Sequence, residues 1–217
     1  MKLFIIFCLL LPLVFGGDPR KCSGFPATRE GLIEAAFNVV NSRKIINYTQ
    51  GPRRWSGIAN GICPSDDVPP YADCSSFVTW LYWSLFGSYP DYLNRARWTG
   101  GYTGTLADNG MPVSLNDAQP GDVVLYRTGN RPYSHAALYV GENRVISYGS
   151  TGPAKLLNVG FFPNKSYDLR TYPDFFAVGT PCNGVQGTCI DTDTTTCSKP
   201  LIAGKCRGPN FVKCCPE

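Results

Sequence analysis

The sequence predicts an α+β domain followed by a small disulfide-rich unit, and three observations lead to this fold class. The first half of the chain has helix-like apolar spacing with capping residues, near residues 28–41 and 73–87. Short runs rich in Val, Ala, Leu and Tyr follow between residues 123 and 148, as in an antiparallel meander. Six of the ten cysteines crowd residues 181–217, which lack apolar periodicity. Helices first and strands second is the α+β arrangement.

The N-terminus predicts export. Lys2 is followed by an apolar run to Phe15, which predicts a secretory signal over residues 1–16 that is too short to span a bilayer. Residues 17–180 are then the main domain, and residues 181–217 are the appendage. We expect a secreted monomer, extracellular or in a lumenal digestive compartment, without membrane contact. The net charge of +4 is too small and dispersed to indicate nucleic-acid binding.

Counting cysteines leaves one thiol unpaired. Ten cysteines less Cys8, which lies in the predicted signal, leave nine in the mature chain. Six are enough for three bridges within the C-terminal unit, in an order that the sequence does not specify. These six are Cys182, Cys189, Cys197, Cys206, Cys214 and Cys215. Cys22 and Cys63 would then link the N-terminus to the loop before the second helix, and Cys74 would be free.

Cys74 is placed at the start of the second predicted helix. Asp73 is a good N-cap, and Gly87 stands where the helix is expected to end. Phe77 and Leu81 begin a four-residue apolar spacing between these caps. The positive end of the helix dipole should lower the pKa of the thiol, which makes Cys74 a candidate nucleophile. The alternative is that Cys74 is half of a disulfide.

The chain has a single histidine, His135, at the start of a predicted strand after a polar loop. An imidazole within reach of a thiol forms a thiolate–imidazolium pair that is active near neutral pH. A single histidine also argues against a catalytic zinc site, which uses two or more imidazoles. We therefore expect His135 to be a general base, with neither metal nor cofactor.

The remaining elements follow from turn residues and apolar runs. Residues 51–70 are expected to be a loop, and residues 88–116 a long loop with one helical turn around 92–95. Gly141-Glu142-Asn143 is expected to form a tight hairpin turn after the strand that begins at His135. Two further strands are expected at residues 155–159 and 175–178.

Three motifs, in this order, resemble the NlpC-type cysteine peptidases of bacterial cell-wall metabolism. They are Tyr71-Ala72-Asp73-Cys74-Ser75-Ser76, Pro120-Gly121-Asp122-Val123 and His135-Ala136-Ala137-Leu138-Tyr139-Val140-Gly141. The resemblance covers roughly residues 28–178. It implies a permuted papain-like fold, with N-terminal helices packed on an antiparallel sheet. It also implies cleavage of peptidoglycan stem peptides, typically between D-glutamate and a diamino acid.

The resemblance also implies roles for single residues. Cys74 matches the nucleophile and His135 the base. Tyr71 matches a tyrosine near the oxyanion site, where the Cys74 backbone N–H is a second donor. Asp73 would cap the helix, and Asp73 and Ser75 belong to the expected oxyanion and substrate-binding group.

The third polar residue of the family departs from its usual His, Asn or Gln. The count from the histidine reaches Ser147, whose hydroxyl is a weaker acceptor for imidazole N–H than a carboxylate is. Ser147, Tyr148 or a backbone carbonyl would then orient the base, or the enzyme would be slow. The alternative is that Ser147 is only a strand residue.

Aromatic and basic residues near the motif are weaker candidates for substrate binding. Trp55 and Trp98, in loops that flank the motif, would form a wall for the substrate, unless they are core residues. Arg53, Arg54, Arg95 and Arg97 could bind stem-peptide carboxylates, although solvated arginines are the simpler interpretation. The C-terminal unit resembles cysteine-rich modules of secreted eukaryotic cell-wall hydrolases, and would bind the wall or stabilise the chain.

The sequence therefore predicts a secreted cysteine peptidase that acts on bacterial peptidoglycan peptides, for antibacterial defence or digestion of bacteria. An N-acetylmuramoyl-L-alanine amidase or an acyltransferase would use the same Cys–His pair. A non-catalytic secreted binding protein or cysteine-rich inhibitor is the alternative from another class.

Overall fold

The computed structural model describes residues 22–87, 91–95, 98–130, 132–192, 195–207 and 212–217. The expected signal over residues 1–16 and the candidate Arg97 lie outside these residues. Within the described part of the chain, no helix has the length and apolar character needed to cross a membrane.

Both predicted helices are present, and their caps explain their limits. Helix α1 is Arg29–Ser42, and the Thr28 hydroxyl accepts a hydrogen bond from the Gly31 N–H at its start. Helix α3 is Cys74–Phe86, capped by Asp73 and ended at Gly87, whose φ of 77° suits a residue without a Cβ.

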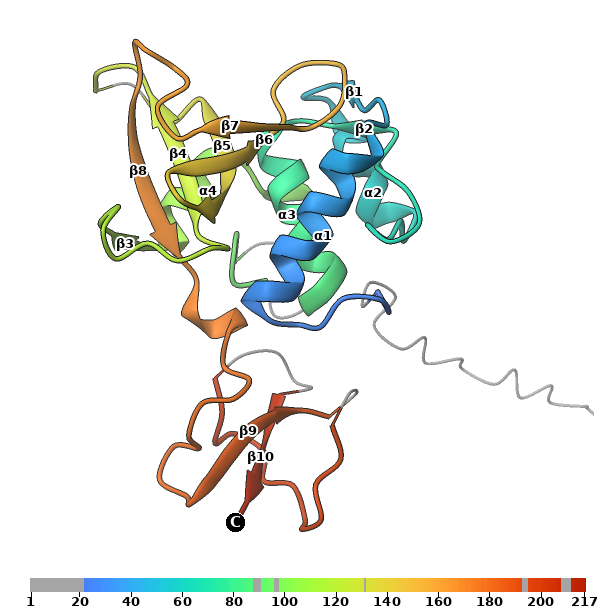
Figure 1. The fold of residues 1–217 in the computed structure, drawn as a ribbon, viewed down its shortest axis with the longest axis vertical. Helices are drawn as coiled ribbons and strands as arrows, with labels where there is room; N and C mark the ends of the chain where they lie inside the picture. The colour runs from blue at the N-terminus through green and yellow to red at the C-terminus, as the bar shows by residue number, and fades with distance from the viewer. Residues whose placement is uncertain (1–21, 88–90, 96–97, 131, 193–194, 208–211) are drawn as a thin grey trace, which may run out of the picture.

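Helix α3 is the centre of the main domain. The four-residue spacing predicted one apolar stripe, but every side chain of α3 is buried. The reason is that α3 packs against α1, against the short helix α2 (Ser56–Ala59) and against strand β5 (His135–Gly141). Figure 1 shows α3 behind α1, between α2 and the sheet. A helix surrounded in this way is apolar on all sides rather than amphipathic.

The sheet has six antiparallel strands in the order β3-β8-β4-β5-β6-β7. Their bounds are β3 Met111–Val113, β4 Val123–Arg127, β5 His135–Gly141, β6 Arg144–Ser147, β7 Lys155–Asn158 and β8 Ser166–Thr171. Strands β4 to β7 lie where the apolar runs predicted them. The turn from β5 to β6 has positive φ at Gly141, Glu142 and Asn143, which confirms the predicted tight hairpin.

The two faces of the sheet bury different clusters because successive side chains alternate across a strand. In β4, Val123 and Leu125 pack into the core shared with the helices. Val124 and Tyr126 point to the opposite face, where Phe161 and other loop residues cover them. Both faces are therefore covered, which explains why this strand reads as an uninterrupted apolar run.

Several expectations for the connections were wrong. The expected loop 51–70 contains a 3₁₀ turn, Pro52–Trp55, followed by α2, and the expected loop 88–116 contains helix α4, Thr103–Asn109, and strand β3. These helices have one or two turns, too short for apolar periodicity to show.

The last predicted strand was also wrong. Residues 175–178 form no strand. A 3₁₀ turn, Pro173–Phe175, reaches their first residue, and Phe175 is buried in the core with the helices. The missing strand is β8, which enters the sheet between β3 and β4. Its alternation is hidden because its sequence, Ser-Tyr-Asp-Leu-Arg-Thr, is mostly polar.

The C-terminal unit is a small disulfide-linked module. Its strands β9 (Gly187–Asp191) and β10 (Val212–Pro216) pair antiparallel. Three bridges hold it, namely Cys182–Cys214, Cys189–Cys206 and Cys197–Cys215. Its buried cluster contains Ala177, so in packing terms the module begins a few residues before the expected boundary at residues 180–181.

Candidate active site

Strand pairing and helix packing bring the three expected catalytic residues into one place. Cys74 is the first residue of α3, and its thiol is free, as the cysteine count predicts. Cys22 and Cys63, the two other cysteines of the main domain, are bonded to each other. His135 begins β5, and Ser147 ends β6, which pairs with β5. The backbone N–H of Ala136 donates to the Cys74 sulfur, so the thiol lies beside the first residues of β5.

The histidine is held by a hydroxyl. Nε2 of His135 is 2.8 Å from Oγ of Ser147, and both side chains are 5% exposed. Gly149 makes room for the ring, because a Cβ at that position would lie 3.0 Å from Cε1 of His135. With Nε2 engaged by Ser147, Nδ1 is the ring nitrogen left for the thiol.

Asp73 organises the start of the helix rather than facing a substrate. One of its carboxylate oxygens accepts from the Ser76 N–H at 2.7 Å and from the Ser75 hydroxyl at 2.9 Å. The Ser76 hydroxyl in turn accepts from the Asp73 N–H at 2.8 Å, which completes a capping box. Ser75 is 3% exposed and its hydroxyl is used by Asp73, so the expectation that it binds substrate is not supported by its position.

Arg54 anchors the same carboxylate from the preceding 3₁₀ turn. Its Nη1 lies 2.6 Å from the second oxygen of Asp73, and its Nη2 donates to the Gly101 carbonyl at 2.7 Å. The side chains of Arg54 and Asp73 are 16% and 5% exposed. Arg54 is therefore an internal ion-pair partner rather than the solvated arginine or carboxylate-binding group that the sequence suggested.

A second tyrosine, Tyr48, which the sequence did not single out, also lies next to the start of α3. Tyr48 lies in β1 (Asn47–Tyr48), which pairs in parallel with β2 (Tyr71–Ala72) just before the helix. The pKa of Tyr48 is raised by burial and by the negative charge of an ionised Cys74. The ring of Tyr71 lies against the Arg53 guanidinium, with 4.2 Å between the ring centroid and Cζ of Arg53. A two-residue strand leaves no periodicity by which the sequence could reveal this pairing.

The pKa shifts of the pair differ from the sequence prediction. Burial and the neighbouring Asp73 charge raise the pKa of Cys74 to about 11, although three backbone N–H groups oppose this. Burial and the charge of Lys165 lower the pKa of His135 to about 4. The helix dipole is therefore outweighed by desolvation, and the resting site holds a neutral thiol beside a neutral imidazole rather than a thiolate–imidazolium pair.

An aromatic loop between β7 and β8 accounts for much of the burial of His135. The ring centroids of Phe161 and Phe162 lie 6.1 Å and 5.3 Å from that of the imidazole, both edge-on. Tyr126 contacts the imidazole from β4 at 5.7 Å. Lys165 lies over Phe162 at 4.3 Å, which brings its positive charge near His135. This loop therefore sets both the desolvation and the local charge of the base.

The two tryptophans expected to form a substrate wall have different positions. Trp55 is 4% exposed, and its ring stacks on Trp83 and meets the edge of Trp98, so it is mainly a core residue. Both Trp55 and Trp98 line an open cavity of about 580 Å³ with Arg53 and Arg54. Trp98 is only half-buried and remains the better candidate for contact with a ligand.

The cysteine-rich module offers no free thiolate for a metal. The sulfur atoms of Cys182, Cys189 and Cys206 lie within 4.8 Å of one another, the one such cluster found among the described residues. All three belong to disulfides, so their sulfur atoms cannot bind a cation as thiolates.

Comparison with known proteins matches the domain that contains this site. The NlpC/P60 family matches residues 52–157. A probable endopeptidase of Mycobacterium tuberculosis is 27% identical over 150 residues, which is 69% of this chain and 31% of that protein. The chain thus spans about a third of the length of this curated relative.

Two solved structures from Mycobacterium tuberculosis are also similar. The peptidoglycan hydrolase RipB is 19% identical, with 66% of each chain covered and a TM-score of 0.43. RipD, described as a non-catalytic NlpC/p60 domain protein adapted to peptidoglycan binding, is 16% identical, with 64% of this chain and 96% of that chain covered and a TM-score of 0.39. Likenesses at this level transfer no activity to this chain. The NlpC/P60 family match therefore covers the segment of the chain that contains Cys74, His135 and Ser147.

Proposed function

We propose that this protein is a cysteine peptidase that hydrolyses amide bonds in peptidoglycan stem peptides, with Cys74 as nucleophile and His135 as base. The observation that carries the proposal is the free thiol at the start of α3, placed beside a histidine whose Nε2 is fixed 2.8 Å from Ser147. A free thiol in a chain whose other described cysteines are all in disulfides needs a reason to stay reduced.

The reaction begins from the neutral pair. Nδ1 of His135 takes the thiol proton as Sγ of Cys74 attacks the carbonyl carbon of the substrate. The developing oxyanion is stabilised by the backbone N–H of Cys74 and by the Tyr48 hydroxyl. The C–N bond then breaks, and the imidazolium returns its proton to the leaving amine. Water, deprotonated by His135, hydrolyses the resulting thioester and restores the thiol.

Ser147 supports this cycle through the far side of the ring. In the proposed cycle, the Ser147 oxygen, 2.8 Å from Nε2 of His135, accepts from the Nε2–H. This tautomer leaves Nδ1 unprotonated and able to receive the thiol proton. When the imidazolium forms, the same hydrogen bond becomes charge-assisted and stronger. Ser147 is thus the third member of the proposed catalytic group, although it is weaker than a carboxylate would be.

The finer details are part of the same proposal. We infer that the scissile bond lies between D-glutamate and the diamino acid, and that the chain is exported, with an antibacterial or bacteria-digesting role. The support is the family match, the four disulfides, which form in oxidising compartments, and the signal-like N-terminal sequence.

Digestion of purified muropeptides tests the proposal. The mature protein should convert a disaccharide tetrapeptide into two products separated at the D-glutamyl bond, as read by mass spectrometry, and Cys74→Ala should form neither. Release of the whole stem peptide from the sugar would instead indicate an N-acetylmuramoyl-L-alanine amidase.

A non-catalytic peptidoglycan-binding role is the second candidate, and one observation favours it. Cys74 and His135 are each 5% exposed, and their pKa shifts keep both neutral at rest. If that candidate were correct, the wild-type protein would bind sacculi without cleaving them and Cys74→Ala would bind equally well.

A further inference from the structure

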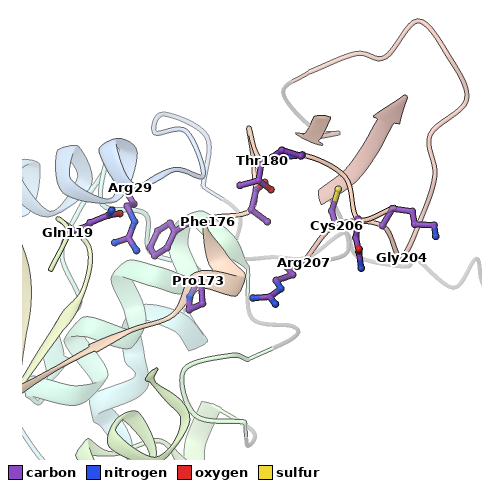
Figure 2. A pocket seen from close by; sticks show the side chains of 12 residues that line it. Arg29, Gln119, Pro173, Phe176, Thr180, Gly204, Cys206 and Arg207 are labelled. Atoms are coloured by element: carbon purple, nitrogen blue, oxygen red, sulfur yellow. The ribbon is translucent and has the colours of Figure 1, made fainter. Parts of the chain in front are cut away.

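A second cavity lies between the main domain and the cysteine-rich module, far from Cys74. It has a volume of about 670 Å³, within the range of sites that hold small ligands. Figure 2 shows Arg29, Gln119 and Phe176 on the main-domain side and Arg207 reaching towards them from the module. The last residue of α3, Phe86, lies at this cleft, because its ring centroid is 5.4 Å from that of Phe176. Cys74 is the first residue of the same 13-residue helix, which places it about 20 Å away along the helix axis.

The lining of this interdomain cleft is cationic and polar. Among the described residues that line it, three are basic and none is acidic. Arg29 is already neutralised, because its Nη1 lies 3.0 Å from the buried Asp122 carboxylate and its guanidinium stacks 4.0 Å from the centre of the Phe176 ring. No ion pair joins Lys205 or Arg207 to an acidic side chain in the part of the chain that the structure describes. These two cations are therefore available for an anionic ligand.

The geometry of the linker keeps the two walls of the cleft together. Phe175 is buried in the helical core and contacts Tyr82 at 5.1 Å, while Ala177 is buried in the core of the module. Only Phe176 lies between these two anchors. The Gly179 N–H donates to the Cys189 carbonyl at 2.8 Å, which ties the next residues of the linker to β9. A linker with one residue between packed anchors has little freedom, so the cleft is a lasting feature rather than a gap between mobile domains.

We propose that this cleft binds a carboxylate-bearing segment of peptidoglycan remote from the bond that is cut, with Lys205 and Arg207 contacting the carboxylates. The inference rests on the proposed function, because peptidoglycan repeats its stem-peptide carboxylates along each strand. A guanidinium can bind a carboxylate through two parallel hydrogen bonds, and an ammonium acts as a point charge. Gln119, Thr180 and Asn183 supply polar groups for the amides of the same segment.

The test measures binding without turnover. The full mature chain carrying Cys74→Ala is sedimented with purified sacculi that have been stripped of teichoic acid, at about 0.15 M ionic strength where weak surface attraction is screened. Lys205→Glu with Arg207→Glu should weaken binding roughly tenfold or more, because charge-assisted contacts are removed and repulsion is added. Lys199→Glu with Lys213→Glu makes the same charge change in the same module outside the cleft and should leave binding within about twofold.

The opposite wall gives an independent variant. Gln119→Glu adds one negative charge from the main domain and should also weaken binding, and Gln119 is exposed, so the change should leave folding intact. Equal loss in the Lys199/Lys213 control, or no loss in the Lys205/Arg207 variant, would overturn the cleft assignment. Binding only to walls that retain teichoic acid would overturn the carboxylate assignment in favour of phosphate.

Failure of this inference is distinguishable from failure of the proposed function. In a background with Cys74 intact, turnover of a small soluble muropeptide should be the same for wild type and for both double variants. Wild-type protein that cleaves muropeptides, together with unchanged sacculus binding in the Lys205/Arg207 variant, refutes the cleft alone. Wild-type protein that cleaves no muropeptide refutes the proposed function, whatever the binding result.

Discussion

Ser147 is the least usual member of the proposed catalytic group, so Ser147→Ala is a stringent test of how the base is held. The hydroxyl lies 2.8 Å from His135 Nε2, and both side chains are 5% exposed, so water cannot easily replace it. Leaving a buried nitrogen unpaired costs about 1–3 kcal/mol. Since the hydrogen bond strengthens when the imidazolium forms, most of this cost should appear in kcat, which we expect to fall roughly 5- to 150-fold with little change in KM.

Two readouts separate a positioning role from a merely structural one. Steady-state kinetics on a muropeptide should show the loss in kcat for Ser147→Ala, and Ser147→Thr, which keeps the hydroxyl, should recover most of it. Because His135 is the only histidine, ¹⁵N NMR reports its tautomer without ambiguity. Wild type should carry the proton on Nε2, whereas Ser147→Ala should show a mixture. A Ser147→Ala protein with wild-type kcat and an unchanged tautomer would refute the reasoning.

Three further predictions follow from the charges around the site. Since burial raises the pKa of Cys74 to about 11, iodoacetamide labelling of Cys74 should rise steadily from pH 5 to alkaline pH, and a plateau below pH 7 that disappears in His135→Ala would contradict the neutral pair. The pKa of His135 is lowered from 6.5 to about 4, so between these pH values the unfolded chain binds a proton that the folded chain does not. The free energy of unfolding, measured with urea, should therefore fall by about 3 kcal/mol as the pH falls through this window. In His135→Gln this pH dependence should be much weaker. Arg54→Gln leaves the Asp73 carboxylate without its cation and should lower the free energy of unfolding by roughly 3 kcal/mol. The control Arg53→Gln removes only the contact with the Tyr71 ring and should lower it by about 1 kcal/mol or less. If both variants lower the thermal midpoint of unfolding equally, the ion pair does not stabilise the fold.

The parts of the fold that sequence reasoning predicted were those with strong local signals. Asp73 and Gly87 marked the ends of α3 because capping and a left-handed stop depend on a few adjacent residues. The hairpin at Gly141 was visible for the same reason. Strand β8 was missed because its place in the sheet depends on pairing with β3 and β4, which lie 39 or more residues earlier. Its alternation rests on only two apolar residues, Tyr167 and Leu169, which is too short a pattern to indicate a strand.

The site was predicted in its elements but not in its electrostatics. Cysteine counting identified the free thiol, and the single histidine identified its partner, because both are matters of residue type and order. The position of Tyr48 next to the start of α3 could not be predicted from the sequence, because it depends on a parallel strand pairing of only two residues. The direction of the Cys74 pKa shift was wrong because desolvation by surrounding elements, which no local pattern records, outweighs the helix dipole.

The most direct test of the central claim is to trap the proposed thioester. Wild-type protein mixed with a γ-D-glutamyl muropeptide and quenched in acid within a turnover should carry the acyl fragment on the peptide that contains Cys74, as mapped by mass spectrometry. His135→Ala should form this adduct far more slowly, and Cys74→Ala should form none. Product formation by Cys74→Ala at the wild-type rate, or turnover by wild type with no adduct at Cys74 on any accessible timescale, would contradict the account.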